Sequence, residues 1–132
     1  MRFLVDTNIF LEVLLNQQSA REARSFLQKS DVHELFISDF SLHSIALILL
    51  RRRAFDLLER FLADTVRSGS VSVLAVSPGD LTQVLAAARH HGLDFDDAYQ
   101  YVLAVQHELP LISFDADFDR TPLGRQRPDE IE

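Results

Sequence analysis

Acidic side chains stand at three points of this sequence where a strand or helix boundary could gather them. Asp6 follows the apolar residues 3–5, Asp97 lies near the start of an apolar helical pattern, and Asp115 comes soon after the apolar residues 111–112. Carboxylates a few ångströms apart repel one another, so their pKa values rise unless a cation neutralises them. Mg²⁺ held by two or three such oxygens keeps several waters and can activate one for attack on phosphorus. The three acids therefore predict a divalent-metal site.

Each of these acids also has a purely structural interpretation. An acid in the place of Asp6 is a common helix cap. Asp97 would be a favourable surface acid at the positive end of a helix dipole, and Asp115 would suit a turn. Only their joint arrangement favours the metal site over these alternatives.

The rest of the composition removes several other chemistries. The chain has no cysteine, which excludes disulfides, zinc–thiolate sites and thiol nucleophiles. Lys29 is the only lysine, and it lies in a polar helical stretch, which disfavours a phosphoryl-aspartate signalling domain. The four glycines stand singly, so no glycine-rich phosphate loop occurs. The net charge of −7 argues against a broadly basic nucleic-acid surface.

The acids must be positioned by an alternation of strands and helices. Short apolar runs predict strands at residues 3–5, 35–37, 71–76 and 111–112. Helical spacing predicts helices at residues 8–15, 19–28, 39–53, 55–66, 80–91 and 94–108. Ser38 or Asp39 can cap the third of these, which we expect to be mostly buried. Strands alternating with helices imply a parallel sheet between helical layers. If the first and last strands are neighbours, the acids meet at the carboxyl edge, where open α/β sheets build their ligand sites.

The length of 132 residues predicts one domain spanning residues 1–132, in which residues 117–132 form an irregular tail. The N-terminus carries no basic and apolar leader. The longest uncharged apolar run, residues 45–50, is too short to cross a bilayer. We therefore expect a soluble cytoplasmic protein that has no contact with a membrane.

Three motifs in order resemble a known family. These are Asp6-Thr7-Asn8 at the start, the pair Asp97-Ala98 at a helix start, and the ending Ser113-x-Asp115-x-Asp117-Phe118. Together they resemble the PIN-domain nucleases, and in particular the VapC-type toxins of toxin–antitoxin systems, over nearly the whole chain. The resemblance implies an α/β/α sandwich around a parallel sheet of four or five strands. It also implies hydrolysis of RNA with Mg²⁺ or Mn²⁺, a homodimer, and an antitoxin protein as partner.

The resemblance also assigns roles to individual residues. It makes Asp6, Asp97 and Asp115 the catalytic acids that bind the metal. Asn8 and Ser113 become polar supports of the site, and Asp96 or Asp117 a possible extra carboxylate.

The sequence departs from the family at one place. The helix after the second strand normally supplies a glutamate, whereas this chain has His43 or Ser44 at the corresponding place. His43 could replace the missing ligand, orient a water, or be an ordinary hydrogen-bonded histidine. The rival interpretation is therefore a degenerate PIN domain that binds RNA or a protein partner without cleaving.

Arginines are the candidates for contacts with a polyanion. Arg120 and Arg125 lie in the tail just beyond Asp115, where they could hold phosphates or meet the antitoxin. Residues 51–53, all arginine, close a predicted helix, and positive charge is favourable at a helix C-terminus in any case. We therefore expect Arg120 and Arg125 to bind RNA.

Overall fold

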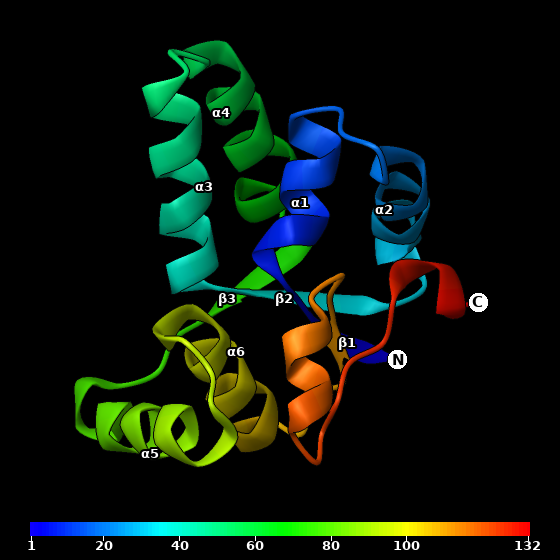
Figure 1. The fold of residues 1–132 in the computed structure, drawn as a ribbon. Helices are drawn as coiled ribbons and strands as arrows, with labels where there is room; N and C mark the ends of the chain where they lie inside the picture. The colour runs from blue at the N-terminus through cyan, green and yellow to red at the C-terminus, as the bar shows by residue number, and fades with distance from the viewer.

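A four-stranded parallel sheet forms the centre of the computed structural model, which describes all residues from Met1 to Glu132 (Figure 1). The strand order is β3-β2-β1-β4, and every neighbouring pair is parallel. The first and last strands along the chain are therefore neighbours, as the meeting of the acids requires. The strands are β1 (Arg2–Val5), β2 (Glu34–Ser38), β3 (Val71–Leu74) and β4 (Leu111–Ile112).

Helices cover both faces of this sheet (Figure 1). One face carries α1 (Thr7–Leu14), α2 (Ala20–Leu27), α3 (Asp39–Arg51) and α4 (Phe55–Phe61); the other carries α5 (Leu81–His91) and α6 (Phe95–Gln106). The predicted three-layer α/β/α sandwich is thus confirmed, with four strands in its sheet. None of the helices combines the length and the apolar character that crossing a membrane needs.

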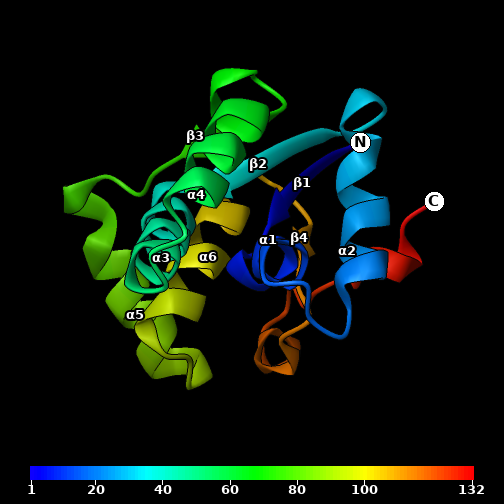
Figure 2. The same cartoon turned by 90° about the horizontal axis from the view of Figure 1, so that it is seen from above.

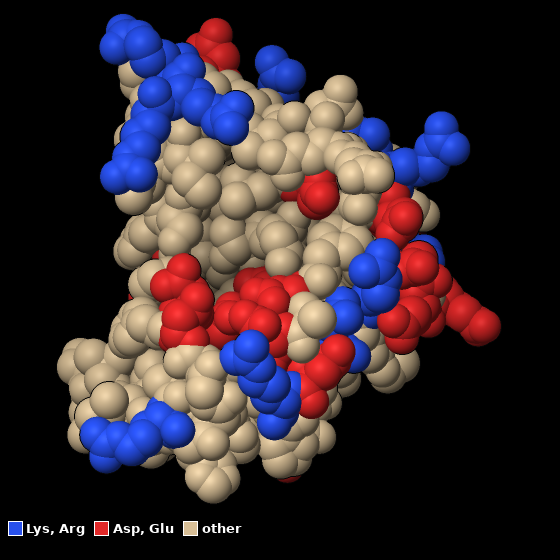
Figure 3. All heavy atoms as spheres, in the orientation of Figure 1, with Lys and Arg blue, Asp and Glu red and all other residues tan.

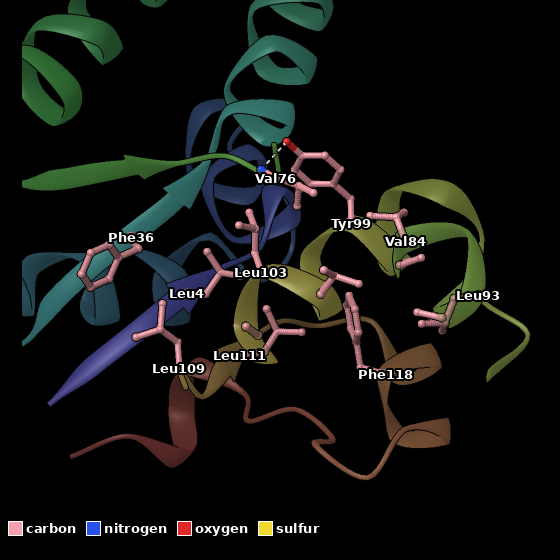
Figure 4. Close-up of a cluster of buried hydrophobic side chains, with 14 residues drawn as sticks. Leu4, Phe36, Val76, Val84, Leu93, Tyr99, Leu103, Leu109, Leu111 and Phe118 are labelled. Atoms are coloured by element: carbon pink, nitrogen blue, oxygen red, sulfur yellow. Dashed lines mark hydrogen bonds between the residues drawn. The ribbon is translucent and has the colours of Figure 1, made fainter. Parts of the chain in front are cut away.

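Alternation along the strands produces two separate cores. Phe3 and Val5 point towards α1 to α4, where they join one cluster of buried side chains, whereas Leu4 between them belongs to the other. The second cluster, drawn in Figure 4, packs the opposite face of the sheet against α5 and α6. Tyr99 lies in this cluster, and its hydroxyl oxygen accepts a hydrogen bond from the backbone N–H of Val76 at 2.9 Å. Because both of their faces are buried, β1, β2 and β4 contain continuous apolar runs, whereas the edge strand β3 leaves Ser72 and Val73 exposed.

The third helix is less buried than the sequence predicts. Only Ser41, Ile45 and Leu49 of α3 are fully buried, while the side chains of Leu47 and Leu50 are 51% and 45% exposed. The expectation of a mostly buried helix is therefore wrong. The reason is that α3 presents one stripe to the sheet and the neighbouring helices and leaves its other side in solvent.

The predicted helix over residues 55–66 also divides in two. Its α-helical part ends at Phe61, and the chain continues as a π-helical turn over Leu62–Arg67 before β3 begins.

The tail has neither an α-helix nor a strand, but it is tied to the rest of the chain. It contains the 3₁₀ turns Ala116–Arg120 and Pro128–Glu130, and Gln126 forms a parallel bridge with Ile112 at the edge of β4. The backbone carbonyl of Ile131 accepts a hydrogen bond from Lys29 Nζ at 2.8 Å. The two termini consequently lie on the same side of the molecule, near α2 (Figure 2).

Candidate metal centre

Local structure brings the three predicted acids to the carboxyl edge of the sheet. Asp6 ends β1 and caps α1, because its side chain accepts a hydrogen bond from the N–H of Thr7 at 2.8 Å. Asp94 caps α6, as its position before that helix predicts, and this places Asp97 in the first helical turn. Asp115 follows β4 and caps the 3₁₀ turn after it. Figure 3 shows acidic side chains gathered in the middle of this face of the molecule.

The tightest group of carboxylates consists of Asp97, Asp115 and Asp117. One oxygen from each lies within 4.8 Å of the others, and no other cluster of three possible metal ligands occurs in the chain. Asp117, expected only as an optional extra acid, is thus part of the cluster. Asp6 lies outside this closest group, but it lines the same pocket as Asp97 and Asp115.

Asp6 is held by hydrogen bonds to both of its carboxylate oxygens. Its Oδ1 accepts from Gln100 Nε2 at 2.8 Å as well as from Thr7 N, and its Oδ2 accepts from Ser113 Oγ at 2.7 Å. An ionised carboxylate has about four lone-pair sites, so these three bonds leave about one for a cation. The side chain is only 6% exposed, which makes it a rigid wall of the site.

Burial and crowding perturb the acids strongly. Burial raises the pKa of Asp97 to about 8, and the neighbouring carboxylates of Asp115, Asp94, Asp6 and Asp117 add to this rise. Burial also raises the pKa of Asp6 against the opposing effect of its hydrogen bonds from Gln100 and Ser113. Carboxyl groups that resist ionisation when no counter-charge is present fit a site that accepts a cation.

Asn8 and Ser113 connect the start of α1 to the segment after β4. Asn8 Nδ2 donates to Ser113 Oγ at 3.3 Å, and Asn8 Oδ1 accepts from the N–H of Phe114 at 3.3 Å. Ser113, which is fully buried, also accepts from the N–H of Asp115 at 2.9 Å. The hydroxyl of Ser113 therefore links Asp6 to the backbone of Asp115.

A pocket of about 430 Å³ opens above the acids. It is lined by Asp6, Thr7, Asn8, Leu11, Ser44, Leu47, Ile48, Arg51, Asp96, Asp97 and Asp115. A larger hollow of about 510 Å³ lies around the amino-terminal ends of β2 and β3, but only two acids line it and they form no metal-binding cluster. Only the pocket above the acids therefore combines room for a ligand with clustered carboxylates.

The structure separates the two candidates for the missing glutamate. Ser44 lines the pocket, whereas His43 is exposed on α3 and is not among the lining residues. Neighbouring residues of a helix point about 100° apart, so only one of them can face the acids. The structure does not bring His43 into the site. Asp96 does line the pocket, although it is exposed.

Two buried polar side chains belong to the site but were not expected from the sequence. Gln100 is 2% exposed, and besides Asp6 its Nε2 donates to Ser41 Oγ at 2.8 Å. Ser41 Oγ in turn accepts from Thr7 Oγ1 at 2.7 Å, which ties α3 to α1. The spacing offered one signal, because Gln100 lies three residues after Asp97 and so shares a helix face with it.

The tail arginines occupy different environments. Arg120 pairs with Asp117 at 3.2 Å and donates to the carbonyl of Gly92 at 2.7 Å, with its side chain 54% exposed. The side chain of Arg125 is only 15% exposed, and its guanidinium contacts Asp119 and the carbonyl of Ser113, both at 3.4 Å. Of the two, only Arg120 keeps an accessible guanidinium beside the acids.

Comparisons with known proteins agree with this geometry. A family model described as the PIN domain matches residues 3–123. Among curated proteins, none matches the chain.

The chain is also similar to solved structures over nearly its full length. A toxin–antitoxin complex from Klebsiella pneumoniae is 21% identical with a TM-score of 0.74, covering 96% of this chain and 97% of that one. VapBC2 from Rickettsia felis, bound to a promoter DNA fragment, is 15% identical with a TM-score of 0.72, covering 95% and 96%. FitAcB from Neisseria gonorrhoeae is 21% identical with a TM-score of 0.70, covering 99% and 100%. These likenesses show that the fold is shared.

Proposed function

The chain belongs to the PIN-domain family, and on that premise we propose that it is a metal-dependent endoribonuclease that hydrolyses RNA phosphodiester bonds. One observation carries the proposal: the carboxylates of Asp97, Asp115 and Asp117 approach within 4.8 Å of one another beside a pocket. The family resemblance implies that clustered acids of this kind bind Mg²⁺ or Mn²⁺ and hydrolyse RNA. We propose that the protein acts on its RNA substrate in the cytoplasm.

We propose that Asp6, Asp97 and Asp115 hold the cation and that Asp117 adds a further carboxylate. An all-oxygen donor set of this kind suits Mg²⁺ and Mn²⁺. Such an ion supplies Lewis-acid chemistry, which makes water a better nucleophile and offsets charge at phosphorus. The chain's own polar groups keep the donors in place, since Ser113 and Gln100 hold both oxygens of Asp6. Loss of a proton from Asp97, whose pKa is raised to about 8, accompanies the binding of a cation.

The site has one negative charge fewer than the family pattern, because Ser44 lines the wall where a glutamate is expected. A serine hydroxyl can hold a water but cannot neutralise a cation. We therefore propose that the protein binds its metal ion more weakly than the family pattern implies but catalyses the same reaction. The rival, a PIN domain that binds RNA without cleaving it, rests on this same substitution.

Titration calorimetry with Mn²⁺ and Mg²⁺, together with cleavage of a fluorophore-labelled RNA, tests the proposed function. We expect the native chain to bind Mn²⁺ and to cut the RNA until EDTA is added, and we expect Asp115→Asn to lose both properties. Asp119→Asn is a matched control, because this exposed acid lies outside the pocket. RNA binding without ion uptake or cleavage would establish the rival.

We further propose that the protein is the toxin of a toxin–antitoxin pair. A solved structure of similar fold, from Klebsiella pneumoniae, is a toxin–antitoxin complex. In this chain, an apolar hollow of about 180 Å³ lies between α1, α2 and α4. It is lined mainly by Phe10, Val13, Leu14, Leu27, Leu57 and Phe61. An apolar helix of an antitoxin suits such a groove. Production of the chain in bacteria should arrest growth, and unaffected growth with an active nuclease would contradict the toxin role.

A homodimer is part of the same proposal. Leu81 and Leu85 stand one turn apart on α5 and are 41% and 58% exposed. Exposed apolar pairs of this kind are typical of surfaces that another chain covers. Light scattering after gel filtration should give twice the monomer mass, and Leu85→Glu should reduce that mass; a monomeric native chain would contradict the dimer.

A further inference from the structure

We infer that Arg51 binds a phosphate group of the RNA strand at the end of the pocket opposite the acids, so that the strand is held on both sides of the cleavage centre. The inference rests on the proposed function, because it names how the same site would hold its substrate. The sequence alone left Arg51 to Arg53 together among the arginine candidates for a polyanion and favoured a plain helix C-terminal role for them.

The geometry of α3 places Arg51 in the pocket. Ser44, Leu47, Ile48 and Arg51 all line it, and their spacing of three, four and seven residues defines one face of a helix. With a rise of about 1.5 Å per residue, Arg51 stands about 10 Å along α3 from Ser44, which lies beside the acids. One continuous pocket therefore has an anionic end and a cationic end.

The guanidinium of Arg51 has no partner within the chain. The side chain is exposed and makes no hydrogen bond, ion pair or cation–π contact. In contrast, Arg125 is largely buried against Asp119, and Arg120 is already paired with Asp117. Arg51 is the only arginine that lines the pocket, and all of its donors are available to a ligand.

The charge pattern of the pocket explains why an arginine is needed there. The acids on one wall repel a phosphodiester backbone, and no lysine or other arginine lines the pocket. Figure 3 shows uncharged atoms in a hollow between the acids and the basic group at the end of α3. Leu11, Leu47 and Ile48 supply the apolar wall in between, against which a ribose or base can lie. The arginine fork matches phosphate oxygens, so the pocket suits a strand running from the acids to Arg51.

A matched pair of variants tests this inference. Arg51→Ala removes the pocket guanidinium, whereas Arg52→Ala removes the same charge from an exposed neighbour outside the pocket. Affinity is measured by fluorescence anisotropy on a single-stranded oligoribonucleotide, with Ca²⁺ in the buffer and a denaturing gel to verify that the strand stays intact. We expect Arg51→Ala to raise Kd about tenfold and to lower the slope of log Kd against log salt by about 0.7. Arg52→Ala should change Kd about twofold at most, because an exposed charge is screened.

Oligonucleotides that carry a single neutral methylphosphonate locate the contact. In the native chain one position should weaken binding as much as Arg51→Ala does, and in that variant the same position should have no further effect. Equal losses for Arg51→Ala and Arg52→Ala would overturn the inference, since only net charge would then matter. If the native chain binds Mn²⁺ and RNA while Arg51→Ala leaves Kd unchanged, Arg51 has another role, such as contact with a protein partner, and the inference alone fails. If the native chain binds no RNA, the inference and the proposed function fail together.

Discussion

Replacement of Asp97 by asparagine should stabilise the metal-free protein while it removes the metal site. The side chain is 7% exposed and is crowded by other carboxylates, which together with burial raise its pKa from 3.8 to about 8. Asp97→Asn keeps the shape of the side chain but has no charge at any pH. We expect the variant to lose the repulsion that the native chain suffers when Asp97 ionises.

Protonation of Asp97 is linked to folding, and this linkage determines the direction and the size of the stability change in Asp97→Asn. The folded state holds the proton of Asp97 up to about pH 8, whereas the unfolded chain releases it near pH 4, so native stability falls as pH rises between these values. One pKa unit corresponds to about 1.4 kcal/mol, which gives an upper limit of about 6 kcal/mol. With solvent screening near the pocket mouth we expect about a third of this, roughly 2 kcal/mol. For a chain of this length that is a rise in Tm of about 6 °C.

Thermal unfolding followed by circular dichroism in EDTA at several pH values measures this effect. The difference in Tm between Asp97→Asn and the native chain should widen from pH 4 to pH 8 and then stay level. Excess Mn²⁺ at pH 8.5 should raise the Tm of the native chain alone. Asp56→Asn is the control, because Asp56 also lies in the first turn of a helix but is exposed and outside the pocket. A variant at residue 97 that is less stable than the native chain at pH 8.5 would refute the reasoning.

Three further changes test the surroundings of the acids. Ser44→Glu returns a carboxylate to the pocket wall and should tighten Mn²⁺ binding about tenfold in calorimetry. His43→Glu adds the same charge outside the pocket and should leave Mn²⁺ affinity unchanged. If both variants bound Mn²⁺ more tightly to the same extent, the place of the added carboxylate would be irrelevant. Gln100→Leu removes the hydrogen-bond donor to Asp6 Oδ1 and Ser41 Oγ and should lower the free energy of unfolding in urea by about 2 kcal/mol. An unchanged midpoint of urea unfolding would contradict a role of Gln100 in holding Asp6. Arg125→Ala should lower the free energy of unfolding by about 1 kcal/mol and leave RNA affinity unchanged. A loss of RNA affinity without a loss of stability would instead support the RNA-binding role that the sequence predicts for Arg125.

Most of the secondary structure could be predicted because its signals are local. Apolar runs identified all four strands, and Asp94 and Gly92 marked the start of α6 and the end of α5 as their residue types predict. Gly92 adopts a positive φ of 66°, which glycine tolerates best. The wrong predictions concern where a helix ends and how much of a helix is buried. The exposure of Leu47 and Leu50 depends on how much of α3 other elements cover, and helical spacing does not report this.

The candidate site could be predicted only in part, for a similar reason. The sequence identified acids at the ends of β1 and β4 and at the start of α6, and the parallel sheet then places them at one edge. It did not indicate that Asp117 would join Asp97 and Asp115 more closely than Asp6 does. It also missed Gln100, because the spacing from Asp97 gives its helix face but not its partners Asp6 and Ser41, which lie on other elements.

The sequence by itself determined the order of strands and helices, the resemblance to the family, and the candidate acids for a cation site. Only the tertiary structure decided that Ser44 faces the pocket while His43 is exposed, and that Arg51 lines the same pocket. The physical reason is that propensity and capping act between residues close in sequence. The rotation of a helix about its axis is set by packing against elements far along the chain, and that rotation decides which side chains share a site.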